Sequence, residues 1–136
     1  MRAGMSFLVA LAVVLGATAG CAQNIPPNST WVNQRGSTLR IVSIDSATGA
    51  LRGEYINQAA GFECKGTPYV ATGWVDSEKI AFSVHWKNAT ADCKSITSWT
   101  GYLEKGFLVT DWDLTYIDAE LGRPAVIRGS DTFTKK

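Results

Sequence analysis

The chain has little of what most catalytic and metal-binding sites are built from. Its 136 residues include a single histidine, His85, and three cysteines that form no Cys-x-x-Cys pair. Zinc and redox sites need clustered cysteine and histidine ligands, and most hydrolytic mechanisms need a general base beside a nucleophile. We therefore expect no enzyme activity, no metal site and no cofactor.

The chain also lacks an excess of charge of one sign. It has 13 Lys and Arg residues and 12 Asp and Glu residues, which gives a net charge of +1, and the basic residues form no run. A nucleic-acid partner or an anionic membrane surface would call for a basic patch. The one long apolar run, from Phe7 to Leu15, is too short to span a bilayer. We expect neither a nucleic-acid partner nor a membrane span.

That apolar run belongs to a predicted secretory signal peptide over residues 1–22. Met1 and Arg2 precede it, and the small residues 16–20 follow it, which is the usual order of such a signal. The protein is therefore expected to be secreted or periplasmic. Cys21 leaves open lipoprotein anchoring as an alternative, although Thr18 stands where lipoproteins usually carry a large aliphatic residue. Residues 23–136 would form one domain.

Cys64 and Cys93 are the cysteines that remain in this predicted domain. An even pair in an exported chain is most often a disulfide, and no neighbouring histidines suggest a metal instead. We expect a structural Cys64–Cys93 bridge.

Apolar and β-branched runs alternate with turn-forming clusters along the domain, and no helical period is visible. The pattern predicts an all-β fold, an eight-stranded antiparallel up-and-down barrel. A two-sheet sandwich is the alternative, because the pattern does not show whether the sheet closes. The expected strands are 29–33, 38–44, 50–55, 68–76, 79–87, 95–103, 107–116 and 125–134.

Tryptophan is abundant, with five residues, and three of them fall at alternating positions within expected strands. A period of two places Trp86, Trp99 and Trp112 on the same faces as small polar side chains. Core packing is the alternative explanation, but unpaired polar groups on an inward face need partners. The pattern favours a ligand pocket with aromatic walls, whose polar side chains are Asn33, Ser37, Tyr55, Asn57, Thr97 and Asp131.

Five segments resemble the avidin and streptavidin family of biotin-binding proteins. They cover the domain in order and with compatible spacing, and the cysteine positions resemble the disulfide-containing dimeric, rhizavidin-like type. The segments are Trp31-Val-Asn-Gln-Arg-Gly-Ser-Thr38, Gly53-Glu-Tyr55, Phe82-Ser-Val-His-Trp-Lys-Asn88, Thr97-Ser-Trp-Thr-Gly101 and Asp131-Thr-Phe-Thr134.

The resemblance implies a secreted, high-affinity, non-covalent biotin-binding protein. Asn33, Ser37 and Tyr55 would donate to the ureido oxygen, and Asn57 and Asp131 would accept from the ureido N–H groups. Thr97 would approach the ring sulfur and Ser95 the valeryl carboxylate. The rings would be enclosed by Phe82, Trp86, Trp99, Trp112 and Leu114. A lipocalin-like carrier of another small apolar ligand is the alternative function.

Two departures from the tetrameric members of that family bear on specificity and assembly. Arg35 stands where streptavidin-like sequences have an aliphatic residue, which would alter the pocket rim. The stretch Leu121-Gly-Arg-Pro124 lacks the tryptophan that those members lend to a neighbouring subunit. The resemblance therefore implies a homodimer, in which each pocket is completed within one chain.

Overall fold

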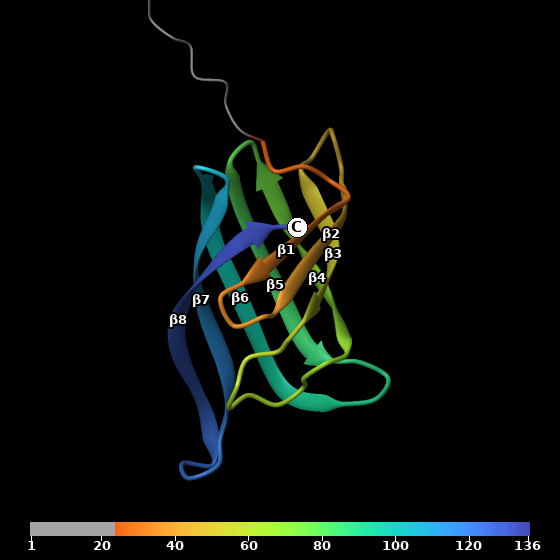
Figure 1. Cartoon of the computed structure of the whole chain (residues 1–136). Coiled ribbons are helices and arrows are strands. Elements are labelled where there is room, and N and C mark those ends of the chain that lie inside the picture. Colours follow the sequence, from red (N-terminus) through yellow and green to blue (C-terminus); the bar gives the residue numbers. More distant parts are fainter. Residues whose placement is uncertain (1–23) are drawn as a thin grey trace, which may run out of the picture.

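The structure is a computed structural model that describes residues 24–136 (Figure 1). The signal peptide predicted over residues 1–22, its cleavage site and Cys21 lie outside the described residues. Eight antiparallel strands follow one another around a closed barrel, in which β8 returns to pair with β1. The barrel is confirmed and the sandwich is excluded. The strands are β1 (Ser29–Asn33), β2 (Thr38–Ile44), β3 (Ala50–Ile56), β4 (Pro68–Asp76), β5 (Lys79–Lys87), β6 (Asp92–Glu104), β7 (Phe107–Asp118) and β8 (Arg123–Lys135).

Side chains alternate between the interior and the surface along the strands, as the pleat requires, except at the bulges in β2 and at the start of β6. The pattern is most regular in β4, where buried and exposed residues alternate from end to end. At one end of the barrel the inward side chains are apolar. Leu39, Ile41 and Leu108 are fully buried there, and Trp31 and Phe133 pair across the strands with Leu39 and Leu108. This apolar packing closes one end of the barrel and leaves the cavity at the other end.

The seam between β1 and β8 is short, and a side chain extends it. The backbone register runs only from Trp31↔Lys135 to Asn33↔Phe133. Beyond it, Gln34 Oε1 accepts from the Thr132 N–H at 3.0 Å, and Gln34 Nε2 donates to the Ser130 carbonyl at 3.2 Å. The Gln34 amide thus replaces a backbone pair on either side of Asp131. These two hydrogen bonds fix the position of the Asp131 side chain relative to the turn after β1.

All eight strands lie where the sequence pattern predicts them, but the later strands are longer than predicted. β6 begins at Asp92 rather than residue 95, so Cys93 lies inside a strand and not in the loop before it. The register of β5 against β6 shifts between His85 and Lys87, and Lys94 has a φ of 50°. A bulge of this kind interrupts strict alternation, which explains why the sequence pattern missed residues 92–94 at the start of the strand.

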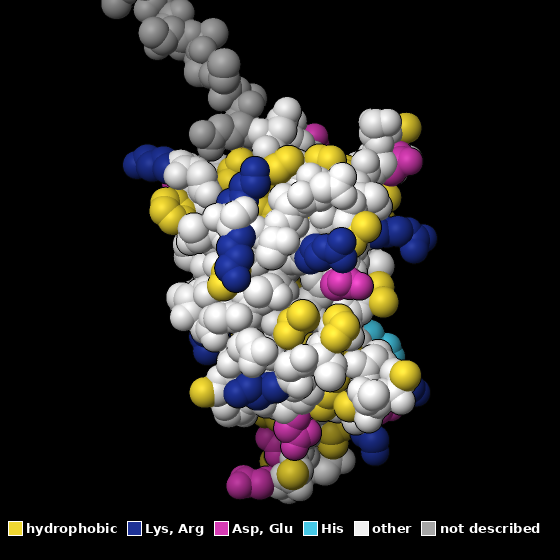
Figure 2. Space-filling model, turned by 45° about the vertical axis from the view of Figure 1, so that its right-hand side comes forward, with side chains coloured by type: hydrophobic (Ala, Val, Ile, Leu, Met, Phe, Trp, Pro, Cys, Tyr) yellow, Lys and Arg dark blue, Asp and Glu magenta, His cyan; other side chains and the backbone are white. Residues whose placement is uncertain are grey.

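The outer surface carries the polar residues that the alternation directs outward. His85, Asp111 and Asp113 are all exposed. Figure 2 shows apolar, basic and acidic side chains interspersed on one face rather than a continuous field of one charge. Within residues 24–136 there is no helix of the length and apolar character needed to cross a membrane.

The predicted Cys64–Cys93 disulfide is present. It joins residues 29 positions apart and ties the loop between β3 and β4, residues 57–67, to the start of β6. This loop begins with Asn57, whose carbonyl accepts from the Gly66 N–H at 3.0 Å. The bridge therefore holds a loop that returns across the open end of the barrel.

Reduction of this bridge is expected to lower the free energy of unfolding by about 3.5 kcal/mol, because the unfolded chain then gains loop-closure entropy. Denaturant unfolding with and without reductant measures the change. A Cys64→Ser/Cys93→Ser double variant is the control, since reductant should leave its stability unaltered. Alkylation of both cysteines in the unreduced protein would contradict the bridge.

Candidate functional site

A cavity of about 560 Å³ opens at the end of the barrel opposite this apolar core. Its volume lies within the range of about 300–1,000 Å³ that is usual for small-molecule sites. Every pocket residue predicted from the sequence lines it, with the exception of Phe82. Those residues are Asn33, Ser37, Tyr55, Asn57, Trp86, Ser95, Thr97, Trp99, Trp112, Leu114 and Asp131.

Asn33 is oriented by the tight turn between β1 and β2. Its Oδ1 accepts from the N–H groups of Arg35 at 3.0 Å and Ser37 at 2.9 Å. The turn depends on Gly36, whose φ of 83° is readily available only to glycine. With Oδ1 engaged, Asn33 Nδ2 points across the barrel and donates to the Tyr55 hydroxyl at 3.3 Å. Asn33 thus presents a donor to the cavity.

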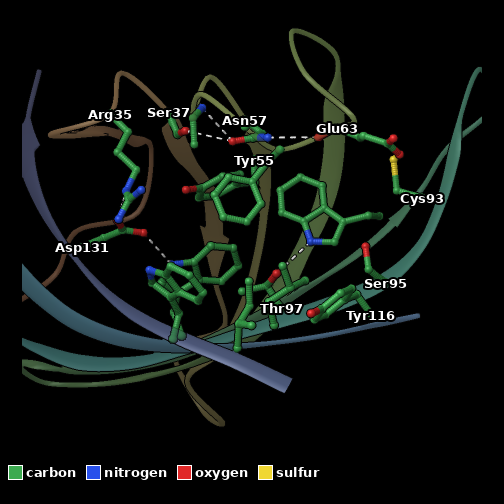
Figure 3. A pocket seen from close by; sticks show the side chains of 18 of the residues that line it. Arg35, Ser37, Tyr55, Asn57, Glu63, Cys93, Ser95, Thr97, Tyr116 and Asp131 are labelled. Atoms are coloured by element: carbon green, nitrogen blue, oxygen red, sulfur yellow. Dashed lines mark hydrogen bonds and ion pairs between the residues drawn. The ribbon is translucent and has the colours of Figure 1, made fainter. Parts of the chain in front are cut away.

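Asn57 and Ser37 are held together by the loop between β3 and β4. Asn57 Oδ1 accepts from the Ala59 N–H at 2.9 Å and from Ser37 Oγ at 3.3 Å. Its Nδ2 donates to the Glu63 carbonyl at 3.1 Å, which assigns the amide orientation. Both polar atoms of Asn57 are therefore positioned by the loop, and its Oδ1 is the acceptor that faces Ser37 (Figure 3).

Asp131 is a buried carboxylate, only 4 % exposed. Its Oδ2 accepts from Trp99 Nε1 at 3.0 Å, and its Oδ1 accepts from Gln34 Nε2 at 3.0 Å. Arg35 Nε lies 3.4 Å from the same Oδ1. An unpartnered charge at this depth would be costly, and these three groups are its partners. The cavity thus contains an anionic acceptor held in one orientation.

Tyr55 is a further polar group at this end of the cavity, and it is almost completely buried. Burial raises its pKa well above the ordinary value, and the nearby charge of Asp131 raises it further. The phenol is therefore neutral over the physiological pH range. Because Asn33 donates to its oxygen, the Tyr55 hydroxyl keeps its own proton for donation.

The raised pKa of Tyr55 predicts a loss of stability in alkali. The unfolded chain releases the phenol proton above about pH 10, whereas the folded protein retains it. The contribution is therefore complete below that pH and disappears as the pH rises toward the pKa of the folded state. Denaturant unfolding across this range should show a steeper decline for the wild type than for Tyr55→Phe. Parallel declines would contradict the assignment.

The apolar walls of the cavity are tryptophans supported by other rings. Trp99 stacks on Phe82 with centroids 4.8 Å apart and planes at 9°, and Tyr55 lies 4.7 Å from Trp99. Contrary to the sequence prediction, Phe82 does not line the cavity but packs behind Trp99. Strand alternation determines whether a side chain faces the interior, but it does not determine how deep in the barrel that side chain lies. Trp86 is fixed by a hydrogen bond from its Nε1 to Thr97 Oγ1 at 2.8 Å.

Trp112 lies toward the open side of the cavity and is half-buried. It pairs across β7 and β8 with Gly129, where any Cβ would overlap the indole ring. Phe62, from the loop between β3 and β4, meets Trp112 edge-on with centroids 6.3 Å apart. Gly129 on β8 therefore leaves room for the Trp112 indole, and the disulfide-tied loop supplies Phe62 beside it.

Several lining residues were absent from the sequence prediction. Tyr116 continues the inward face of Trp112 and Leu114, so the period of two could have found it. Phe62 sits in a loop, which has no period to identify it. Arg35 was noted as a rim residue, but its pairing with Asp131 joins residues that are far apart in the sequence. The lining residues that were not predicted as ligand contacts include Arg35, Ala59, Phe62, Glu63, Lys94, Tyr116 and Ile127.

Comparison with known proteins gives matches over most of the chain. The Avidin family model matches residues 21–136. Afifavidin from Afifella pfennigii is 46% identical over 111 residues, which cover 79% of this chain and 67% of that protein. A short afifavidin–biotin complex superposes with a TM-score of 0.73 at 45% identity, covering 79% of this chain and 87% of that one. A rhizavidin–biotin complex gives a TM-score of 0.76 at 42% identity, covering 82% and 92%.

Proposed function

The chain belongs to the avidin family, and from this premise we propose that it is a high-affinity, non-covalent biotin-binding protein. Biotin is its ligand, held in the barrel and not chemically changed, so we assign the cavity no catalytic role. The observation that carries the proposal is the set of oriented donors and acceptors around one end of an aromatic cavity. Related proteins of known structure have been solved in complex with biotin.

The polar set matches the hydrogen-bonding groups of a cyclic urea. The ureido oxygen needs donors, which Asn33 and Tyr55 supply, and Ser37 becomes the third when its hydroxyl turns from Asn57 Oδ1 to the ligand. The two ureido N–H groups need acceptors, which are Asn57 Oδ1 and the Asp131 carboxylate. Donors on one side and a charged acceptor on the other polarise the urea cooperatively in a site removed from water.

The remaining residues fit the apolar rings and the acid tail. Trp86, Trp99 and Trp112, with Leu114, enclose the bicyclic rings, and Thr97 lies near the ring sulfur. Ser95, at the side of the cavity away from Asp131, would donate to the valeryl carboxylate (Figure 3). Phe82 supports this enclosure through its stack on Trp99.

Titration calorimetry tests the proposal directly. Biotin-free protein should bind one biotin per chain with a saturable heat and should bind desthiobiotin more weakly, because that analogue lacks the ring sulfur. A fatty acid is the control for a lipocalin-like carrier. Saturable binding of the fatty acid without binding of biotin would favour that alternative and exclude biotin binding.

We further propose that the protein is secreted or periplasmic. The Cys64–Cys93 disulfide supports export, because such bridges persist in oxidising compartments. Cell fractionation followed by mass measurement of the N-terminal peptide tests this. A chain retained in the cytoplasm with its first residues intact would contradict export, and a lipid-modified Cys21 would indicate anchoring.

We also propose a homodimer. An outward row of residues crosses three strands through the pairs Ile96↔Thr115 and Thr115↔Val126. Ile96, Ile117 and Val126 are each about half exposed, and a two-fold interface would cover them. Light scattering coupled to size exclusion should give the mass of two chains, and Ile96→Glu should reduce it to one. A mass near four chains would overturn the dimer.

A further inference from the structure

The cavity continues past the residues assigned to biotin. On the side away from Asp131, the last of those residues is Ser95, the donor to the acid tail. Figure 3 shows Tyr116 on that same side of the cavity. Three apolar side chains that biotin does not use line the cavity there, and we call them the mouth cluster: Phe62 from the loop between β3 and β4, Tyr116 from β7 and Ile127 from β8.

Two members of the mouth cluster lie where the β7–β8 hairpin extends beyond its neighbouring strands. Backbone pairing of β7 with β6 ends at Thr115, and β8 pairs with β1 only from Phe133 onward. Beyond these limits the two strands pair only with each other. Figure 1 shows this hairpin projecting past the other strands. A two-stranded hairpin is marginally stable alone, so its apolar inward face gains from being covered.

That inward face is partly open to solvent. Ile127 pairs with Leu114, another residue that lines the cavity, yet Ile127 is 37% exposed. Tyr116 is half-buried, and its hydroxyl donates to Asp118 Oδ2 at 3.4 Å. Because that hydroxyl already has a partner, the hairpin presents mainly apolar surface to a ligand. Covering this surface would be favourable, in proportion to the area removed from water.

The third member, Phe62, is held in place by the loop that carries it. The Cys64–Cys93 bridge ties this loop to β6, and Phe62 meets Trp112 edge-on with centroids 6.3 Å apart. The mouth cluster therefore joins a ring that already contacts a wall of the biotin cavity. A ligand that extends from the cavity meets this surface without a rearrangement of the barrel.

The charged side chains beside the mouth cluster favour an uncharged occupant. Glu63, Asp92 and Lys94 line the cavity and are exposed. Asp92 pairs with Lys87 at 3.5 Å, which leaves Glu63 and Lys94 with opposite charges. These groups offer a ligand no net charge and can remain hydrated when it binds.

From this arrangement we propose that the mouth cluster is a subsite for an alkyl chain joined to the tail of biotin through an amide, as in a biotinylated lysine side chain. This inference rests on the proposed function. An amide keeps a carbonyl oxygen, so Ser95 can donate to it as it would to the carboxylate. The free acid ends at Ser95 and leaves the mouth cluster in water. The methylene groups of an alkyl amide continue past Ser95 and bury that apolar surface.

The test compares the N-methyl and N-butyl amides of biotin. Both have the amide, but only the butyl chain is long enough to cover the mouth cluster. The wild type should bind the butyl amide about tenfold more tightly, because the additional methylene groups leave water. In Ile127→Ser this ratio should fall to about twofold. Displacement calorimetry against a weaker biotin analogue measures each affinity, and the methyl amide serves as the reference within each variant.

Leu121→Ser is the matched control, because Leu121 is 57% exposed on the same hairpin and does not line the cavity. It should keep the wild-type ratio. If the wild type binds biotin but binds both amides equally, or if Ile127→Ser keeps the full ratio, the inference is wrong while the proposed function stands. If the wild type binds no biotin, both are wrong. Ile127→Ala, which should also lower the ratio, replaces a serine variant that does not fold.

The alkyl amide could belong to free biotinyl-lysine or to a biotinylated protein. Biotinyl-lysine and a peptide that carries one biotinylated lysine separate these sources, and the more tightly bound of the two identifies the ligand of the subsite. Weaker binding of both than of the methyl amide would overturn the inference.

Discussion

Replacing Asp131 by alanine should weaken biotin binding by about one to two orders of magnitude or more, because a charge-assisted hydrogen bond contributes about 1.5–3 kcal/mol. The substitution removes the acceptor for a ureido N–H. It also leaves Trp99 Nε1 and Gln34 Nε2 without the oxygens that they contact at 3.0 Å. Part of the loss therefore arises from donors left unpaired beside the ligand. Titration calorimetry, with a displacement format if binding is too tight, measures the change.

Two further variants separate charge from shape at this position. Asp131→Asn keeps the size of the side chain and one oxygen acceptor but loses the negative charge, so its affinity should fall between those of the wild type and Asp131→Ala. Asp111→Ala is the control, because Asp111 is exposed on the outer face of β7. Affinity in Asp131→Ala equal to that of the wild type would remove this residue from the biotin site.

The period of two is why so much of the site was predictable. Thr97, Trp99, Trp112 and Asp131 lie on regularly paired stretches of strand, where one inward residue determines the next. Once the barrel closes, inward side chains from neighbouring strands must meet. Their convergence is therefore a consequence of local pattern and closure, and it needs no knowledge of long-range contacts.

Depth within the barrel and contacts across its seam were not predictable in the same way. Alternation directs Phe82 inward, but its place behind Trp99 depends on the packing of both rings. Gln34 and Arg35 occupy a turn, where no period applies. Their partners on β8 lie almost a hundred residues away in the chain. Only the closed barrel brings this turn beside Asp131.

Trp99 faces inward as strand alternation predicts, and its contacts with Phe82 and Asp131 depend on packing inside the closed barrel. Its truncation is therefore expected to affect both stability and binding. Trp99→Ala removes the ring that stacks on Phe82 at 4.8 Å and lies 4.7 Å from Tyr55, and it removes the donor to Asp131 Oδ2. Emptying a site of this size in a packed interior should lower the free energy of unfolding by about 3–5 kcal/mol. As a buried aromatic wall, Trp99 should also contribute at least about 2 kcal/mol to biotin binding.

Trp99→Phe distinguishes the ring from its hydrogen bond. It should recover much of the stability, because an aromatic ring still contacts Phe82 and Tyr55, but only part of the affinity, because no indole N–H orients Asp131. Tyr102→Ala is the control on the same strand, since Tyr102 faces outward and is 47% exposed. It should leave biotin affinity at the wild-type value. Denaturant unfolding and calorimetry on the same preparations report both quantities. Equal biotin affinities for Trp99→Phe and the wild type would show that the Trp99–Asp131 hydrogen bond does not position the carboxylate for its ligand.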